Sequence, residues 1–190
     1  MTTSDAPQRR YSVQINGTTW AGEMYVPVHV SGVFVCLGAD CAAQTSTDAF
    51  QNLHLATLPL NLPDAEISSE ASDLKAIIDW VRQHAMTRNR PIIVFASGSA
   101  LHAHAALSAA VQEPGDMAGV ILYRTNIDNS SLNLLPKIEC PVLWIAEQTL
   151  QDIAAPNLEI WEAGSKVSSE RLASWIAELV RPPDLDENPL

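Results

Sequence analysis

Short apolar runs alternate along this chain with longer segments in which apolar residues recur at helical spacing. The runs are rich in valine, isoleucine and leucine, which is typical of strands buried on both faces of a parallel sheet. We therefore predict buried strands at Gly32–Gly38, Leu53–Leu62, Pro91–Phe95, Gly119–Tyr123 and Pro141–Ala146, and a short edge strand at Asn157–Trp161.

Two segments between and after these runs have the pattern of amphipathic helices, with apolar residues at i, i+3, i+4 and i+7. These residues are Leu74, Ile77, Ile78 and Val81 in the first segment and Leu172, Trp175, Ile176 and Leu179 in the second. Serines that can cap the helices precede them, at Ser68 or Ser69 and at Ser168. Strands that alternate with helices predict an α/β fold with a mostly parallel sheet and helices on both faces.

The chain opens with a different pattern. Tyr11, Val13 and Ile15 alternate with polar residues, Asn16-Gly17 is a hairpin turn signal, and Thr18–Val26 reads as a returning strand. This predicts an antiparallel hairpin ahead of the parallel sheet. We expect one domain over residues 10–181, a disordered start over residues 1–9 and a flexible acidic tail over residues 182–190, without an inserted lid domain.

Charge and cysteine content narrow the function classes. The 190 residues have a formal net charge of -11, which argues against nucleic acid or an anionic membrane as partner because both attract basic surfaces. No apolar run approaches the ~20 residues that span a bilayer. Cys36, Cys41 and Cys140 are expected to be free thiols in a reducing compartment, so we predict a cytoplasmic protein. A thiol enzyme that uses Cys36 or Cys41 is a third hypothesis, and Cys41 is the better candidate because it lies in the loop by the crevice.

The segment after Pro91–Phe95 carries the chemistry. Ala96-Ser97-Gly98-Ser99-Ala100 is a run of small residues that joins the predicted strand to an alanine- and leucine-rich helix. This context resembles the nucleophile turn G-x-S-x-G of α/β-hydrolases, with Gly98 at the central position where the nucleophile belongs. In that family the turn holds its central residue in a strained backbone conformation, which a glycine adopts without cost.

The resemblance extends over residues 32–180 and is closest to the lidless, dienelactone-hydrolase-like members of the α/β-hydrolase superfamily. It implies a catalytic triad in the chain order Ser, Asp, His. Gly98, Leu150 and Lys166 stand at these three positions, so the resemblance implies a degenerate triad. The glycine of the loop that supplies an oxyanion-binding N–H has its counterpart in Gly38.

Other residues could fill the catalytic roles. Ser97 or Ser99 are the alternative nucleophiles, and Asp128 follows a strand after which the acid is occasionally found. A base could come only from the five histidines, which are His29, His54, His84, His102 and His104. His102 and His104 lie ~200° apart around a helix, which argues against a shared metal site. We predict no metal and no cofactor.

Two functions follow as hypotheses. The first is a pseudoenzyme that binds a ligand or a protein partner, including a second copy of itself. Its ligand would be a small anion or carbonyl compound, held over Gly98 by backbone N–H groups near Ala39 and at Ser99 and by a helix dipole. The predicted binding residues are Gly38, Ala39, Gly98, Ser99, Tyr123 and Arg124. The alternative is an active serine hydrolase or esterase that uses Ser97 or Ser99 with a non-standard base.

Overall fold

The computed structural model describes residues 9–15, 18–60, 70–147, 153, 155–163 and 167–181. The strands are β1 (Arg9–Ile15), β2 (Thr18–Val26), β3 (Gly32–Leu37), β4 (Leu55–Leu60), β5 (Ile92–Ser97), β6 (Gly119–Tyr123), β7 (Val142–Ala146) and β8 (Leu158–Glu162). The helices are α1 (Cys41–Thr45), α2 (Asp48–Gln51), α3 (Glu70–Gln83), α4 (Ala100–Gln112), α5 (Asn129–Leu132) and α6 (Ser169–Val180), with a 3₁₀ turn at Leu135–Lys137.

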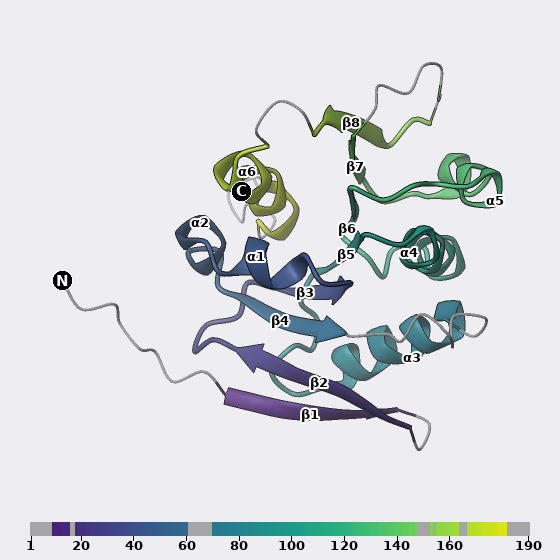
Figure 1. Ribbon diagram of the computed structural model, residues 1–190. Helices are drawn as coiled ribbons and strands as arrows, with labels where there is room; N and C mark the ends of the chain where they lie inside the picture. Colours follow the sequence, from purple (N-terminus) through teal and green to yellow (C-terminus); the bar gives the residue numbers. More distant parts are fainter. Residues whose placement is uncertain are drawn as a thin grey trace, which may run out of the picture.

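The strands form one eight-stranded sheet in the order β1-β2-β4-β3-β5-β6-β7-β8 (Figure 1). β1 and β2 are antiparallel, β2 meets β4 in antiparallel fashion, and β4 to β8 run parallel. The predicted hairpin, the interior position of β5 and the edge position of β8 are confirmed. Arg9, assigned to the disordered start, belongs to β1. Asn16-Gly17, Ser68, Ser69 and the tail lie outside the described residues.

Successive side chains of β5 enter two separate cores because a strand points its side chains alternately to either face of the sheet. Ile92, Val94 and Ala96 join the core under α3, α4 and α5, whereas Ile93 and Phe95 join the core under α2 and α6. Figure 1 shows α3, α4 and α5 on one side of the sheet and α1, α2 and α6 on the other. The prediction of helices on both faces is therefore confirmed.

The two amphipathic helices bury the predicted stripe. Leu74, Ile77, Ile78 and Val81 of α3 are all buried. In α6, Leu172 and Ile176 are fully buried, and Trp175 and Leu179 pack beside them as partly buried residues. Ser168 accepts a hydrogen bond from the Arg171 N–H and caps α6 as predicted. α4 differs from these two helices because most of its residues are buried, so it lacks the wide polar face of an amphipathic helix.

The order of the strands locates the functional edge. The chain passes from β3 to β4 on one side and then crosses to β5 on the other side of β3, after which it continues outward to β8. Ligands of open α/β sheets bind outside the carboxyl ends of the strands at such a reversal. The loop that begins at Gly38 and the turn at Gly98 follow the two strands at this point.

The cysteine prediction was wrong for two of the three residues. Cys36 and Cys41 are joined by a disulfide, whereas Cys140 is free. The tight turn between β3 and α1 brings their Cα atoms to 5.8 Å, within the range that a disulfide bridges. The disulfide removes Cys41 as a candidate nucleophile and weakens the thiol argument for a reducing compartment. Among the described helices, none is both long and apolar enough to cross a membrane.

Replacement of Ile176 by alanine should lower the free energy of unfolding by about 2–5 kcal/mol, because it empties space in a core that cannot fully collapse. The matched control is Glu178→Ala on the exposed side of α6, which should change stability by less than about 0.5 kcal/mol. Urea unfolding of both variants and the parent measures the difference. Equal midpoints for the two variants would contradict the burial of this face.

Candidate functional site

The turn between β5 and α4 has a left-handed glycine at its centre. Gly98 has a φ of +76°, as the resemblance to a nucleophile turn predicted. The Ser99 N–H donates to the Ser97 carbonyl at 2.9 Å and closes the turn. The Ser99 hydroxyl then accepts from the Leu101 N–H at 3.2 Å and caps α4. The Ser99 N–H is thus engaged inside the turn, which differs from the expectation that it points into a crevice.

Gly98 itself faces open space. A Cβ atom built on this residue would have no neighbour within 4 Å, and the residue is exposed. A side chain here would therefore project freely from the carboxyl edge of the sheet, as a nucleophile must. Glycine presents no functional group at this position, so the turn keeps its shape without the atom that would react.

The Ser97 hydroxyl is directed inward and not toward the open side. Ser97 is only 1% exposed, and its hydroxyl donates to the Leu37 carbonyl and accepts from the Asp40 N–H, both at 3.4 Å. These two partners belong to the segment after β3. Ser97 therefore links the two loops at the functional edge, and its oxygen is not presented to a substrate.

Gly38 allows this close approach. Its φ is +100°, and a Cβ atom at this position would lie 2.6 Å from the carbonyl oxygen and 2.6 Å from the hydroxyl oxygen of Ser97. Contacts this short are incompatible with any side chain. The glycine is needed both for its backbone conformation and for the space it leaves. The exposed Ala39 follows it at the rim.

His102 lies beneath the turn and is 6% exposed. Its Nδ1 atom is 3.0 Å from the Ser97 carbonyl oxygen, so we assign the proton to Nδ1. Nε2 is then the bare nitrogen, and it is buried without a hydrogen-bond partner among the described residues. His102 therefore supports the turn from below, where its ring cannot take a proton from a group on the open side of the turn.

His104 takes part in a cluster that contains the three residue types of a triad. Its Nδ1 atom is 3.0 Å from the Ser131 hydroxyl and 3.4 Å from the Ser130 hydroxyl. Ser130 donates to Asp128 at 2.8 Å, so the serine stands between the carboxylate and the imidazole. A catalytic triad needs the histidine in the middle, because the imidazole must take the proton of the hydroxyl.

The Asp128 carboxylate is also a poor base. Hydrogen bonds from the Ser131 hydroxyl, the Ser131 N–H and the Ser130 hydroxyl lower the pKa of Asp128 to about 2. Asp128 caps α5 through the Ser131 N–H at 2.8 Å. The cluster therefore stabilises the start of α5 and joins it to α4, and it does not form a triad.

The remaining histidines lie at the other edge of the sheet. His29 precedes β3, His54 precedes β4 and His84 precedes β5. Residues that precede parallel strands gather at the amino edge, opposite to the turn at Gly98. Leu150 and Lys166, the other two predicted triad positions, lie outside the described residues.

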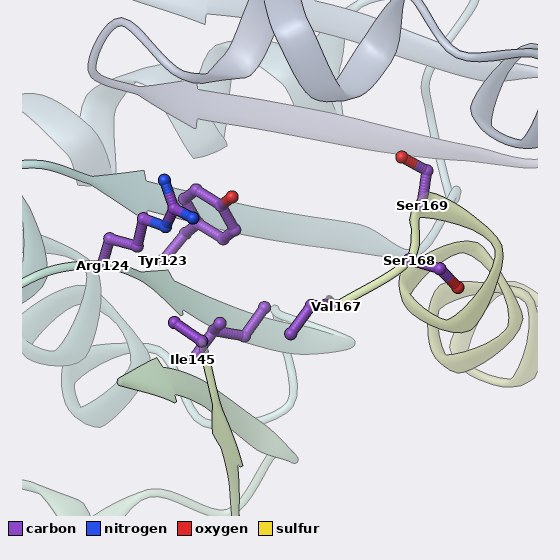
Figure 2. Close-up of a pocket in the computed structure, with 7 residues that line it drawn as sticks. Tyr123, Arg124, Ile145, Val167, Ser168 and Ser169 are labelled. Atoms are coloured by element: carbon purple, nitrogen blue, oxygen red, sulfur yellow. The ribbon is translucent and has the colours of Figure 1, made fainter. Parts of the chain in front are cut away.

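A pocket of about 370 Å³ opens beside the turn (Figure 2). It lies between the carboxyl ends of β6, β7 and β8 and the start of α6. The residues that line it are Tyr123, Arg124, Ile145, Ala163, Val167, Ser168 and Ser169. Tyr123 pairs with Ser97 in the sheet register, so the pocket adjoins the turn through neighbouring strands.

The predicted binding residues therefore fall into two groups. Tyr123 and Arg124 line the pocket, whereas Gly38, Ala39, Gly98 and Ser99 form the adjoining loop and turn and do not line it. The sequence analysis did not predict that Val167, Ser168 and Ser169 line a pocket, because it assigns Ser168 the role of a helix cap alone. The sequence position of Ser168 could have indicated this, because a helix that follows the last parallel strand begins at the carboxyl edge of the sheet.

Arg124 is held at the pocket by its backbone. Its φ of +49° is a left-handed conformation that is uncommon for a side chain of this size, and its N–H donates to the Ile145 carbonyl at 2.9 Å. The guanidinium carbon is 5.3 Å from the centroid of the Tyr123 ring, which itself stacks on Phe95 at 5.6 Å. Non-glycine residues in such conformations are concentrated at functional sites.

Metal binding and thiol chemistry find little support among the described residues. Among the described residues, no three His, Cys, Asp or Glu side chains are grouped so that they could hold a metal ion. Cys140 is the free thiol, and burial raises its pKa to about 11, which keeps it protonated and unreactive.

Comparison with known proteins identifies the fold. No family model matches the sequence, and no curated protein matches it. Among solved structures, a dienelactone hydrolase from Anabaena variabilis is similar with a TM-score of 0.66 and 17% identity, over 90% of this chain and 96% of that one. The Pyrococcus furiosus esterase Pf2001 has a TM-score of 0.68 and 13% identity, over 91% of each chain.

A cold-adapted esterase from an Arctic intertidal metagenomic library is similar as well, with a TM-score of 0.62 and 13% identity over 92% of this chain and 94% of that chain. At these identities the likeness concerns the fold. The chain has an α/β-hydrolase fold that is dienelactone-hydrolase-like, as the sequence predicted.

Gly38→Ala should destabilise the protein more than Gly115→Ala. Both glycines have positive φ, +100° and +85°, but a Cβ atom at Gly115 would have no neighbour within 4 Å. Gly115→Ala is therefore the control that carries the backbone strain alone, on the order of 1–3 kcal/mol. Any further loss in the free energy of unfolding of Gly38→Ala measures the cost of the close approach to Ser97. Thermal and urea unfolding of both variants give the comparison, and equal losses would show that the loop moves away without cost.

Proposed function

We propose that this α/β-hydrolase-fold protein has lost the hydrolase reaction and acts as a binding protein at the carboxyl edge of its sheet. The observation that carries the proposal is Gly98. It occupies the exposed centre of the turn with a positive φ, and the space around it is free. The position from which a nucleophile would act therefore has the required geometry and no reactive group.

The surrounding groups support the same conclusion. Acyl transfer by this fold needs a hydroxyl to attack, an imidazole to take its proton and a carboxylate to orient the imidazole. The Ser97 hydroxyl is buried in hydrogen bonds to the loop after β3, and the Ser99 hydroxyl caps α4. The His102 ring lies below the turn, and His104 belongs to the helix-capping cluster.

The proposed ligand is a small anion or carbonyl compound. Binding would need neither proton transfer nor a covalent intermediate, only a concave site with suitable polar groups. The pocket beside the turn offers this, with a tyrosine, an arginine and two serines among its lining residues.

The competing candidate is an active serine hydrolase that uses Ser99. Two observations favour it over Ser97: Ser99 is only partly buried, and it directly follows the exposed Gly98. The solved esterases with the same fold make this reaction class the natural alternative. In this case one of the five histidines would have to move within reach of the Ser99 hydroxyl and act as a non-standard base.

A serine-reactive fluorophosphonate separates the two candidates. We expect no labelling of the parent protein above that of a Ser97→Ala, Ser99→Ala double variant, because no hydroxyl at the turn has a base as partner. Intact-mass spectrometry after incubation measures the adduct, and an assay with an activated ester is run in parallel. A phosphonylated peptide that contains Ser99, together with turnover that the double variant lacks, would contradict the proposal.

Restoring the serine should not restore the reaction. Gly98→Ser places a non-glycine residue at φ +76°, so we expect a loss of about 1–3 kcal/mol in stability and no esterase activity. Triad members act as a unit, and one member should recover little of their ~10⁶-fold effect.

Gly98→Ala is the matched control because it carries the same backbone strain without a hydroxyl. The two variants should melt together below the parent, and both should be inactive. An acyl-enzyme formed by Gly98→Ser alone would mean that a base and an acid exist near the turn.

A further inference from the structure

The pocket between β6, β7, β8 and α6 has a lining that is unusual for this acidic chain. None of its seven lining residues is acidic, and Arg124 is the only charged one. The chain as a whole has a net charge of -11. The described lining of the pocket therefore carries one positive charge and no negative charge.

The Arg124 guanidinium is available to a ligand. It makes no ion pair in the described part of the chain, and it lies over the face of the Tyr123 ring. In contrast, Arg82 is paired with Asp116 at 2.6 Å. An arginine that rests on an aromatic ring keeps its fork of N–H donors free, and this fork matches the two oxygens of a carboxylate.

The backbone of Arg124 and the ring beneath its side chain are held in place before any ligand binds. The hydrogen bond from its N–H to the Ile145 carbonyl holds the strained backbone, and the stack of Tyr123 on Phe95 fixes the ring beneath the guanidinium. Phe95 in turn contacts Phe34, which contacts Phe50, so a row of aromatic side chains anchors the pocket in the core. A site of this kind loses little freedom when a ligand binds.

The other lining residues of the pocket indicate which groups a ligand would carry besides a negative charge. Ile145, Ala163 and Val167 supply an apolar surface, and in Figure 2 Val167 lies toward Ile145 on the segment that leads into Ser168 and Ser169 at the start of α6. A volume of about 370 Å³ is small for a ligand site. One cation suits a single negative charge, whereas a phosphate dianion usually requires several donors of positive charge.

We propose that this pocket binds a small monocarboxylate with a short apolar or aromatic body. The carboxylate pairs with the Arg124 guanidinium, and the body lies against Tyr123, Ile145 and Val167. The proposal rests on the binding function proposed above and specifies the chemical class of its ligand.

Isothermal titration calorimetry on the full chain tests it with benzoate as the probe, beside its neutral analogue benzamide and inorganic phosphate. Benzoate should bind, benzamide should bind at least about 10-fold more weakly because it lacks the charge, and phosphate should bind more weakly than benzoate. Arg124→Gln should reduce benzoate affinity on the order of 10-fold or more. This variant keeps a non-glycine residue at the left-handed position, so the backbone strain is unchanged.

Arg88→Gln is the charge-matched control, because Arg88 is an exposed residue between α3 and β5 at the other edge of the sheet. It should bind benzoate as the parent does. A second variant, Ser169→Glu, places a carboxylate in the pocket at the first residue of α6, where a negative charge favours the helix. It should keep the melting temperature of the parent and lose benzoate binding.

Several outcomes would overturn the proposal: no heat with benzoate, equal affinity for benzamide, or equal losses in Arg124→Gln and Arg88→Gln. Phosphate binding as tight as benzoate binding would overturn the claim that the ligand carries an apolar or aromatic body. The loss of catalysis is read separately by phosphonate labelling. Absent benzoate binding with no labelling would reject the ligand class alone, and labelling at Ser99 would reject the binding-protein function whatever the calorimetry shows.

Discussion

The close approach of two backbone segments at the carboxyl edge of the sheet is the constraint on which this site depends. The loop after β3 passes Ser97 so tightly that a Cβ atom at Gly38 would lie 2.6 Å from two Ser97 oxygens. On the other side of this contact, the chain turns from β5 into α4 through Gly98 at φ +76°. Both glycines have left-handed backbones, and both lie at the edge where the strand order reverses and places a crevice.

This arrangement occurs here with a glycine at the position that a nucleophile occupies in active enzymes of this fold. In an active enzyme of this fold, the residue at the centre of the turn accepts backbone strain in order to present a hydroxyl. With glycine at the centre the strain disappears, while the shape of the turn, the cap at Ser99 and the buried link through Ser97 remain. The turn then joins β5 to α4 next to the pocket without lining it.

Backbone strain occurs at the pocket too, as it does at His54 and Asn89 elsewhere in the described chain. Arg124 is held in a left-handed conformation although it is not a glycine, and its side chain lies over Tyr123 at the mouth. Gly98 lacks the backbone strain that a nucleophile would carry there, whereas Arg124 beside it is a non-glycine residue in a left-handed conformation. The Arg124 guanidinium gives the described lining of the pocket one positive charge, on a protein whose net charge is -11.

The sequence alone determined the order of strands and helices, the hairpin, the interior β5 and the glycine at the turn, because these depend on local periodicity, caps and backbone preference. It did not determine which residues from distant segments meet. The disulfide between Cys36 and Cys41, the order Asp128–Ser130–His104 and the joining of Tyr123 and Arg124 with Val167 and Ser169 were decided by the tertiary structure. These contacts depend on how tightly a turn closes and how a helix docks against strand ends, and neither has a periodic signal in the chain.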